Sequence, residues 1–145
     1  MHTGSAATKP PEVAQADKPR VVVMGASGYI GTNLVSELAA RGYPVRAAAR
    51  SMAVLAARGW KGVELAQADV LEMTAIEAAL AGQDVAFYLV HCMRAGDDFD
   101  DVERRGAQNF AAAAARAGIK RIVYLGGLIP RDADARHLVS RRVTG

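Results

Sequence analysis

Residues 21–31 read VVVMGASGYIG, and this stretch decides the fold of the chain. A run of apolar residues typical of a buried strand ends in a glycine loop, and helix-forming sequence follows from Tyr29. Gly25 permits the tight turn, and Gly31 lets the new helix lie close to its strand. Gly28 has no Cβ, so phosphate oxygens can approach the backbone N–H groups at the positive end of the helix dipole. The stretch predicts a dinucleotide-binding loop; the alternative is a tight strand-to-helix turn without a ligand.

Behind this loop, short apolar runs alternate with helical segments, which indicates a parallel sheet rather than hairpins. The predicted strands are Arg20–Met24, Val45–Ala49, Val63–Ala68, Val85–Val90 and Arg121–Leu125. The predicted helices are Tyr29–Arg41, Met52–Arg58, Ala75–Ala81 and Phe99–Ala117, each leading into a glycine that suits a C-terminal cap. We expect an α/β fold, a Rossmann-type doubly wound parallel sheet with its ligand outside the carboxyl ends of the strands.

Two local patterns refine the helices. Thr74 and Glu77 have the spacing of a capping box, which places the start of the third helix at Ala75. In the first helix, Ile30, Leu34 and Leu38 form the stripe that we expect to face the sheet.

The composition fits one folded domain. The chain has 145 residues, of which 51% are hydrophobic, so a sizeable core is feasible. Residues 1–19 lack both periodicity and an apolar signal region, and we expect a disordered leader before a domain spanning residues 20–129. No apolar run is long enough to span a membrane. The single cysteine, Cys92, fits a reducing compartment, so we expect a cytoplasmic location.

The basic balance of the chain does not indicate nucleic-acid binding. Residues 21–129 carry 11 Lys and Arg against 11 Asp and Glu, so the net charge of +3 comes from the two ends. A nucleic-acid surface needs its basic residues on the folded body. We therefore expect no nucleic-acid partner.

The loop after the second strand bears on the choice of dinucleotide. A site specific for NAD usually has a carboxylate there to hold the ribose 2′-hydroxyl, whereas this strand ends in Arg50-Ser51. Guanidinium and hydroxyl groups would bind a 2′-phosphate. The pattern predicts a preference for NADP(H), with NAD(H) as the other cofactor considered, unless Arg50 is only a solvated arginine.

Two further strand ends supply candidate ligand contacts. Asp69 can accept a hydrogen bond from the adenine amine while the backbone of Val70 brackets the ring, or it can cap the following turn. Val90 would pack on a ribose, and His91 could donate a hydrogen bond to ribose or substrate or be a structural histidine.

The remaining reactive residues are one cysteine and a group of acidic residues, and both have ordinary structural explanations. Cys92 has no adjacent basic group and reads as a small buried thiol rather than a nucleophile. The acidic residues at the start of the fourth helix are expected to be partners of the helix dipole, and we expect no metal site; they are Asp97, Asp98, Asp100, Asp101 and Glu103.

Five consecutive strand ends together carry a family resemblance. The motifs are Gly25-Ala-Ser-Gly-Tyr-Ile-Gly31, Val45-Arg-Ala-Ala-Ala-Arg50, the Asp69 strand end, Tyr88-Leu-Val-His91 and Arg121-Ile-Val-Tyr-Leu-Gly-Gly-Leu128. This combination resembles the atypical short-chain dehydrogenase/reductases, and most of all their NmrA-like, NAD(P)H-binding group. The resemblance covers about residues 20–129. It implies cofactor contacts at Gly25, Ser27, Gly28, Tyr29, Ile30, Gly31, Arg50, Asp69, Val70, Val90 and His91.

The chain departs from the wider superfamily in two ways. Classical members carry a Tyr-x-x-x-Lys pair after the fifth strand, but no Tyr or Lys follows Leu128, so the catalytic residues stay unknown. Family domains also continue through further strands, whereas residues 130–145 read as the start of one more helix. We expect a truncated domain that lacks the C-terminal strands and can self-associate through the open edge of its sheet.

Three functions are compatible with these features. The first is an NADP(H)-binding domain of an oxidoreductase that transfers hydride to or from a small carbonyl or quinone-like substrate. The second is a non-catalytic NAD(P)-sensing module, which the missing Tyr-x-x-x-Lys pair favours. The third is an inactive fragment.

Overall fold

The computed structural model describes residues 17–91 and 98–126, which form a parallel sheet flanked by helices. Its strands are β1 (Val21–Met24), β2 (Val45–Ala49), β3 (Glu64–Gln67), β4 (Val85–Tyr88) and β5 (Arg121–Tyr124). Neighbouring strands pair in the order β3-β2-β1-β4-β5, and every pair is parallel. The predicted Rossmann-type α/β sheet is therefore confirmed, with β1 at its centre.

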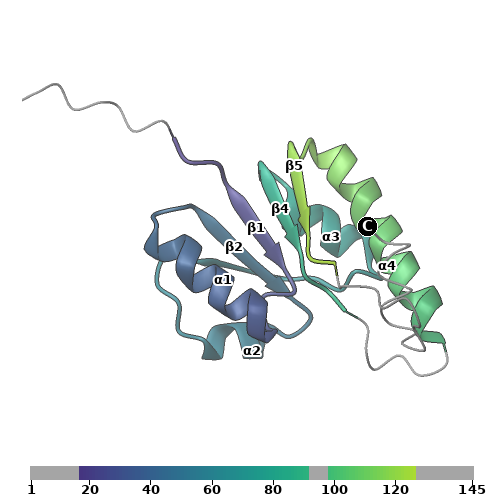
Figure 1. The fold of residues 1–145 in the computed structure, drawn as a ribbon, viewed down its shortest axis with the longest axis horizontal. Coiled ribbons are helices and arrows are strands. Elements are labelled where there is room, and N and C mark those ends of the chain that lie inside the picture. Colours follow the sequence, from purple (N-terminus) through teal and green to yellow (C-terminus); the bar gives the residue numbers. More distant parts are fainter. Residues whose placement is uncertain (1–16, 92–97, 127–145) are drawn as a thin grey trace, which may run out of the picture.

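Four helices connect the strands and lie on the two faces of the sheet (Figure 1). They are α1 (Tyr29–Ala40), α2 (Met52–Ala57), α3 (Met73–Leu80) and α4 (Phe99–Ala117). Helices α1 and α2 cover one face, and α3 and α4 cover the other. The expected order of strands and helices agrees with these elements, whose ends differ from the predicted ones by a few residues.

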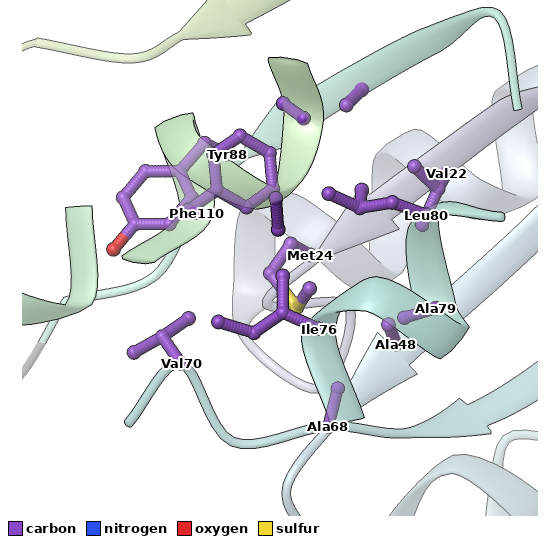
Figure 2. Packing of buried hydrophobic residues seen from close by; sticks show 13 residues of the cluster. Val22, Met24, Ala48, Ala68, Val70, Ile76, Ala79, Leu80, Tyr88 and Phe110 are labelled. Carbon is purple, nitrogen blue, oxygen red and sulfur yellow. The ribbon is translucent and has the colours of Figure 1, made fainter. Parts of the chain in front are cut away.

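The central strand explains why residues 21–24 are apolar without interruption. Successive side chains of a strand point to opposite faces, so a strand covered on both faces needs apolar residues at every position. Val22 and Met24 join the cluster under α3 and α4, which also holds Ile76 and Leu80 (Figure 2). Val21 and Val23 join the cluster under α1 and α2.

The capping box predicted at the third helix is wrong. Helix α3 begins at Met73, with Glu72 at the N-cap and no side-chain cap hydrogen bond, so Thr74 already lies inside the first turn. The cause is the preceding turn, in which the Asp69 carbonyl accepts from Glu72 N at 2.9 Å. This turn starts the helix earlier than the Thr74–Glu77 spacing suggests.

The stripe predicted for the first helix is wrong at one position. Leu34 and Leu38 pack against the core as expected, but Ile30 is exposed and Val35 is buried. Gly31 is also buried, because it lies directly on the glycine loop. This contact sets the rotation of α1 and turns Ile30 away from the sheet.

Several predictions concern residues that the structure does not describe. Residues 1–16 of the expected leader, Cys92 and the expected helix at 130–145 lie outside the described residues. Within the described ranges, no helix combines the length and the apolar character that crossing a membrane requires.

Candidate functional site

The glycine loop between β1 and α1 is held on both sides by hydrogen bonds. The backbone nitrogens of Gly25 and Ala26 donate to the Ala48 carbonyl on β2, at 2.9 and 3.1 Å. The Thr32 hydroxyl on α1 donates to the Ala26 carbonyl at 3.0 Å. The loop therefore has a defined shape before any ligand arrives.

Gly25 is a glycine because the turn requires it. Its φ is +90°, a conformation that L side chains rarely adopt, and an added Cβ would lie 2.9 Å from the Leu89 carbonyl group. The predicted role of Gly25 in the tight turn is confirmed. The same contact shows that the loop lies directly against the end of β4, where Val90 and His91 follow.

Gly31 is a glycine because α1 packs tightly on the loop. An added Cβ would lie 2.3 Å from the Gly25 carbonyl oxygen and 2.8 Å from Ala26 Cα. Both atoms belong to the backbone, so they cannot move aside cheaply. The helix is thus brought close to the loop and the strand end, as the sequence predicts.

Gly28 differs from both, because the fold places no demand on it. It is exposed, its φ is −73°, and an added Cβ would have the Gly25 carbonyl oxygen as its neighbour at 3.6 Å, an ordinary contact. Gly28 is also the N-cap of α1 and has no side chain with which to cap it. The first turn of the helix consequently presents its N–H groups and its positive dipole end at an open backbone surface.

The residues flanking Gly28 shape this opening. Tyr29 is 87% exposed and Ile30 is 51% exposed, so both apolar side chains project from the first turn of α1. The Ser27 carbonyl accepts from the guanidinium of Arg58, at the end of α2, at 2.8 Å. Arg58 therefore places a cation beside the loop. This contact was not predicted from the sequence, because no local sequence pattern indicates it.

The ends of β2 and β3 lie side by side at the same edge. Arg50 is exposed, and its carbonyl accepts from the Gln67 side chain at 3.0 Å. The Ser51 hydroxyl accepts from Val54 N at 3.3 Å and caps α2, a contact that does not use the hydroxyl proton. The cation available at this loop is the Arg50 guanidinium.

Asp69 and Val70 follow β3 and turn towards the third helix. Asp69 Oδ1 accepts from Leu71 N at 3.0 Å, the turn-capping arrangement considered as an alternative from the sequence. The Val70 side chain is buried in the core (Figure 2), and its carbonyl accepts from Asn109 Nδ2 at 3.0 Å. The adenine contacts expected at these two residues stay predictions.

The end of β4 brings His91 to α4. His91 Nδ1 lies 3.6 Å from Oε1 of Glu103, whose side chain is 2% exposed. Glu103 is thus a buried residue beyond the first turn of α4, whereas Asp100 and Asp101 lie exposed in the first turn, where the sequence predicts partners of the helix dipole.

A signal for the burial of Glu103 was present in the sequence. Glu103 precedes Gly106 by three residues and Phe110 by seven, which places the three on one face of a helix. Gly106 and Phe110 are both buried in α4, and Glu103 shares their face.

The described site is a single strip along the carboxyl edge of the sheet. The glycine loop touches the end of β4, and Ala68 N donates to the Ala49 carbonyl, which joins the ends of β2 and β3. The candidate residues on four neighbouring strands thus come together, as expected for a ligand site at the switch point of a doubly wound sheet.

Comparison with known proteins supports this architecture. A sequence model of the NmrA-like family matches residues 17–137. Rice cinnamoyl-CoA reductase 1 is 35% identical over 115 residues, which is 74% of this chain and 34% of that protein. The (4-alkanoyl-5-oxo-2,5-dihydrofuran-3-yl)methyl phosphate reductase of Streptomyces griseus is 34% identical over 122 residues, covering 84% of this chain and 39% of that protein.

Solved structures share the fold. The triphenylmethane reductase of a Citrobacter species, crystallised with NADP(H), superposes with a TM-score of 0.72 at 22% identity, covering 86% of this chain and 43% of that one. The chain spans between a third and two fifths of the length of the two curated relatives.

Proposed function

This chain belongs to the NmrA-like family, and on that premise we propose that it forms the NAD(P)-binding part of an oxidoreductase. The observation that carries the proposal is the bare backbone at Gly28. Gly25 and Gly31 are explained by the fold, but a side chain at Gly28 would meet no obstacle among the residues that the structure describes. A missing Cβ at an exposed helix N-cap keeps the backbone open to a ligand.

The pyrophosphate of a dinucleotide is the ligand that fits this surface. Its negative charge is stabilised by the N–H groups at the start of α1, a helix of 12 residues with no acidic side chain in its first turn. Gly28 lets the phosphate oxygens reach the backbone, while Tyr29 and Ile30 flank them. The prepared shape of the loop lowers the ordering cost of binding.

The other candidate residues divide between the two halves of the dinucleotide. Arg50, Asp69 and Val70 lie at the ends of β2 and β3 and would bind the adenosine half. Val90 and His91 lie at the end of β4 and would contact the nicotinamide half. The bound nicotinamide would supply the redox chemistry, and the protein would bind and orient it.

The reaction that we propose is hydride transfer to or from a small carbonyl or quinone-like compound. Both curated relatives described above are named reductases, and this chain is similar to one part of each. Their names support a redox reaction. A non-catalytic sensor would bind the same dinucleotide without consuming it. Turnover of NADPH with a panel of carbonyl and quinone acceptors separates these two functions.

The dinucleotide proposal is tested by thermal unfolding of the chain with saturating NADPH or NADH. A ligand that binds only the folded state stabilises it by about 2.7 kcal/mol at a hundred times its dissociation constant. We expect the midpoint of unfolding to rise with NADPH. A midpoint that neither dinucleotide moves would contradict the proposal.

The preference for NADP(H) is a separate proposal and rests on Arg50. Its exposed guanidinium would pair with the 2′-phosphate, so Arg50→Ala should weaken NADPH binding about tenfold and leave NADH binding unchanged. Arg41→Ala removes an exposed arginine from the far end of α1 and serves as the control. Equal loss of affinity for both dinucleotides in Arg50→Ala would contradict a 2′-phosphate contact.

We also propose that the chain self-associates through β5. Among the described strands β5 pairs with β4 alone, and Ile122 on it is 46% exposed. An exposed edge with apolar side chains favours pairing with a second copy. Sedimentation should show a dimer at high concentration that Ile122→Lys removes, and a chain that stays monomeric throughout would oppose this idea.

A further inference from the structure

The buried carboxylate of Glu103 is not explained by the proposed function. A charge taken out of water is costly unless it is paired or hydrogen-bonded. Within the described part of the chain, Glu103 Oε1 lies 3.6 Å from His91 Nδ1, and Oε2 is buried without a hydrogen-bond partner. Because burying such a carboxylate costs stability, its position suggests a role other than stabilising the fold.

The fold brings this carboxylate to His91 by means of a glycine. An added Cβ at Gly106 would lie 2.7 Å from Val70 Cγ2 and 3.4 Å from the Tyr88 hydroxyl oxygen. The missing side chain thus lets α4 lie close against the sheet. Glu103, less than one turn earlier on the same face, is carried to the end of β4.

Glu103 is the charged group that faces His91 from α4. The next cation along this helix, Arg104, is exposed and pairs with Asp101 instead. Within the described residues, Tyr88 on β4 is a further titratable group, and its ring packs on Phe110 at a centroid distance of 4.6 Å. The Glu103 carboxylate is therefore a negative charge that α4 places 3.6 Å from the imidazole.

The other side of His91 leads to the glycine loop. Leu89 N donates to the Met24 carbonyl at 2.9 Å, and the Leu89 carbonyl group lies against Gly25. Two residues later His91 follows β4 at the same edge of the sheet as the glycine loop. His91 thus contacts a buried carboxylate at the edge of the sheet that carries the proposed ligand site.

We propose that Glu103 is a positioning residue, whose carboxylate fixes the His91 imidazole through Nδ1 and keeps it protonated, so that His91 donates a hydrogen bond to an oxygen atom of the bound dinucleotide. A carboxylate at one ring nitrogen fixes the orientation of the ring and leaves the other nitrogen as the working one. The identity of the ligand rests on the proposed function. The pairing of Glu103 with His91 does not.

The pairing is tested by following His91 in the full-length chain without ligand, using NMR over a range of pH. The signal is assigned by its loss in His91→Gln, and His2 and His137 serve as internal references. We expect the pKa of His91 to lie above that of an ordinary histidine, because the nearby negative charge favours the imidazolium. A wild-type His91 that titrates at or below the ordinary value would overturn the proposal without any further variant.

The cause is tested by Glu103→Gln, which keeps the shape of the side chain and removes its charge. This substitution should lower the pKa of His91, raising its proton dissociation constant about tenfold or more. Glu37→Gln, an exposed swap of the same kind on α1, should leave His91 unchanged. An unchanged His91 in Glu103→Gln would show that the carboxylate does not act on it.

Two further measurements separate positioning from a structural role. Glu103→Gln should stay folded at neutral pH with at most a modest loss of stability, because His91 can release its proton once the carboxylate charge is gone. Addition of NADPH to the wild-type chain should shift the His91 signal. If NADPH raises the unfolding temperature but leaves that signal in place, the donor role is overturned. If NADPH binds nowhere, the dinucleotide proposal fails while the Glu103–His91 pair is still judged by its titration.

Discussion

Among single residues, each of the three glycines of the loop has a different physical reason for lacking a side chain. Gly25 has a positive φ, Gly31 makes room for a helix packed on backbone atoms, and Gly28 has neither constraint. The difference separates what the fold requires from what a ligand requires.

Gly31→Ala should therefore destabilise the folded chain. Its Cβ would overlap the Gly25 carbonyl oxygen, and overpacking of this kind costs about 1–3 kcal/mol. Gly28→Ala should leave the free energy of unfolding at the wild-type value or slightly higher. Urea denaturation of both variants checks this difference, and a Gly31→Ala variant as stable as the wild type would contradict the packing argument.

The glycine loop was predictable from the sequence because its structural requirements involve residues that are close in sequence. The turn at Gly25 depends on one backbone conformation, and the apolar run before it shows that the strand is buried. The contacts of Glu103 and Arg58 were not predicted because they involve elements that are distant in sequence. Glu103 meets the end of β4, and Arg58 crosses from α2 to the Ser27 carbonyl.

At the level of helices and strands, Arg46 on β2 connects β3 with the end of α3. Its guanidinium donates to the carbonyls of Ala79 and Ala81, at 2.7 and 2.9 Å, where α3 ends. The same side chain pairs with Glu64 on β3 at 2.9 Å and is largely buried. Arg46 therefore satisfies carbonyls that the end of α3 leaves unpaired and neutralises the negative end of its dipole.

Arg46→Met should lower the free energy of unfolding by about 1–3 kcal/mol, because the Ala79 and Ala81 carbonyls lose a charged donor. Arg41→Met is the matched control, since Arg41 makes an exposed pair with Glu37 on one helix, and water screens this pair. Chemical denaturation of the two variants measures the difference. Equal effects would show that the contacts of Arg46 with α3 do not stabilise the fold.

The elements themselves were predictable because buried parallel strands and their capping glycines leave strong local patterns. Gly42, Gly59, Gly82 and Gly118 all have the positive φ expected after a helix. The start of α3 was not predictable from the Thr74–Glu77 spacing, because the turn at Asp69 determines it. Likewise, the packing of Gly31 on the loop determines which side of α1 is buried.

At the scale of the whole molecule, Asp84 links the two halves of the sheet at the edge opposite the candidate site. Its carboxylate accepts from Arg20 N at 2.9 Å and from the Lys120 ammonium at 3.0 Å. The backbone hydrogen bond from Arg20, and then the hydrogen bond from Lys120, hold the pKa of the Asp84 carboxyl below its usual range. The start of β1, the start of β4 and the residue before β5 meet at this one carboxylate.

Because the pKa of Asp84 is lowered by folding, its stabilising contribution is full above the ordinary carboxyl range and is lost as pH falls through the lowered value. We expect Asp84→Asn to unfold more easily than the wild type at neutral pH. The two proteins should converge at a pH below both values. Thermal melts from neutral to strongly acidic pH check this, with Asp101→Asn as an exposed control; a gap that persists in strong acid would contradict the electrostatic origin.

Calorimetric titration of NADPH into the wild type and Gly28→Ala shows whether the bare backbone at Gly28 is kept for a dinucleotide. We expect the wild type to bind, and the variant to be equally stable but to bind at least about tenfold more weakly, since its methyl group displaces the phosphate. A Gly28→Ala variant that is folded and binds NADPH as tightly as the wild type would contradict this role of Gly28.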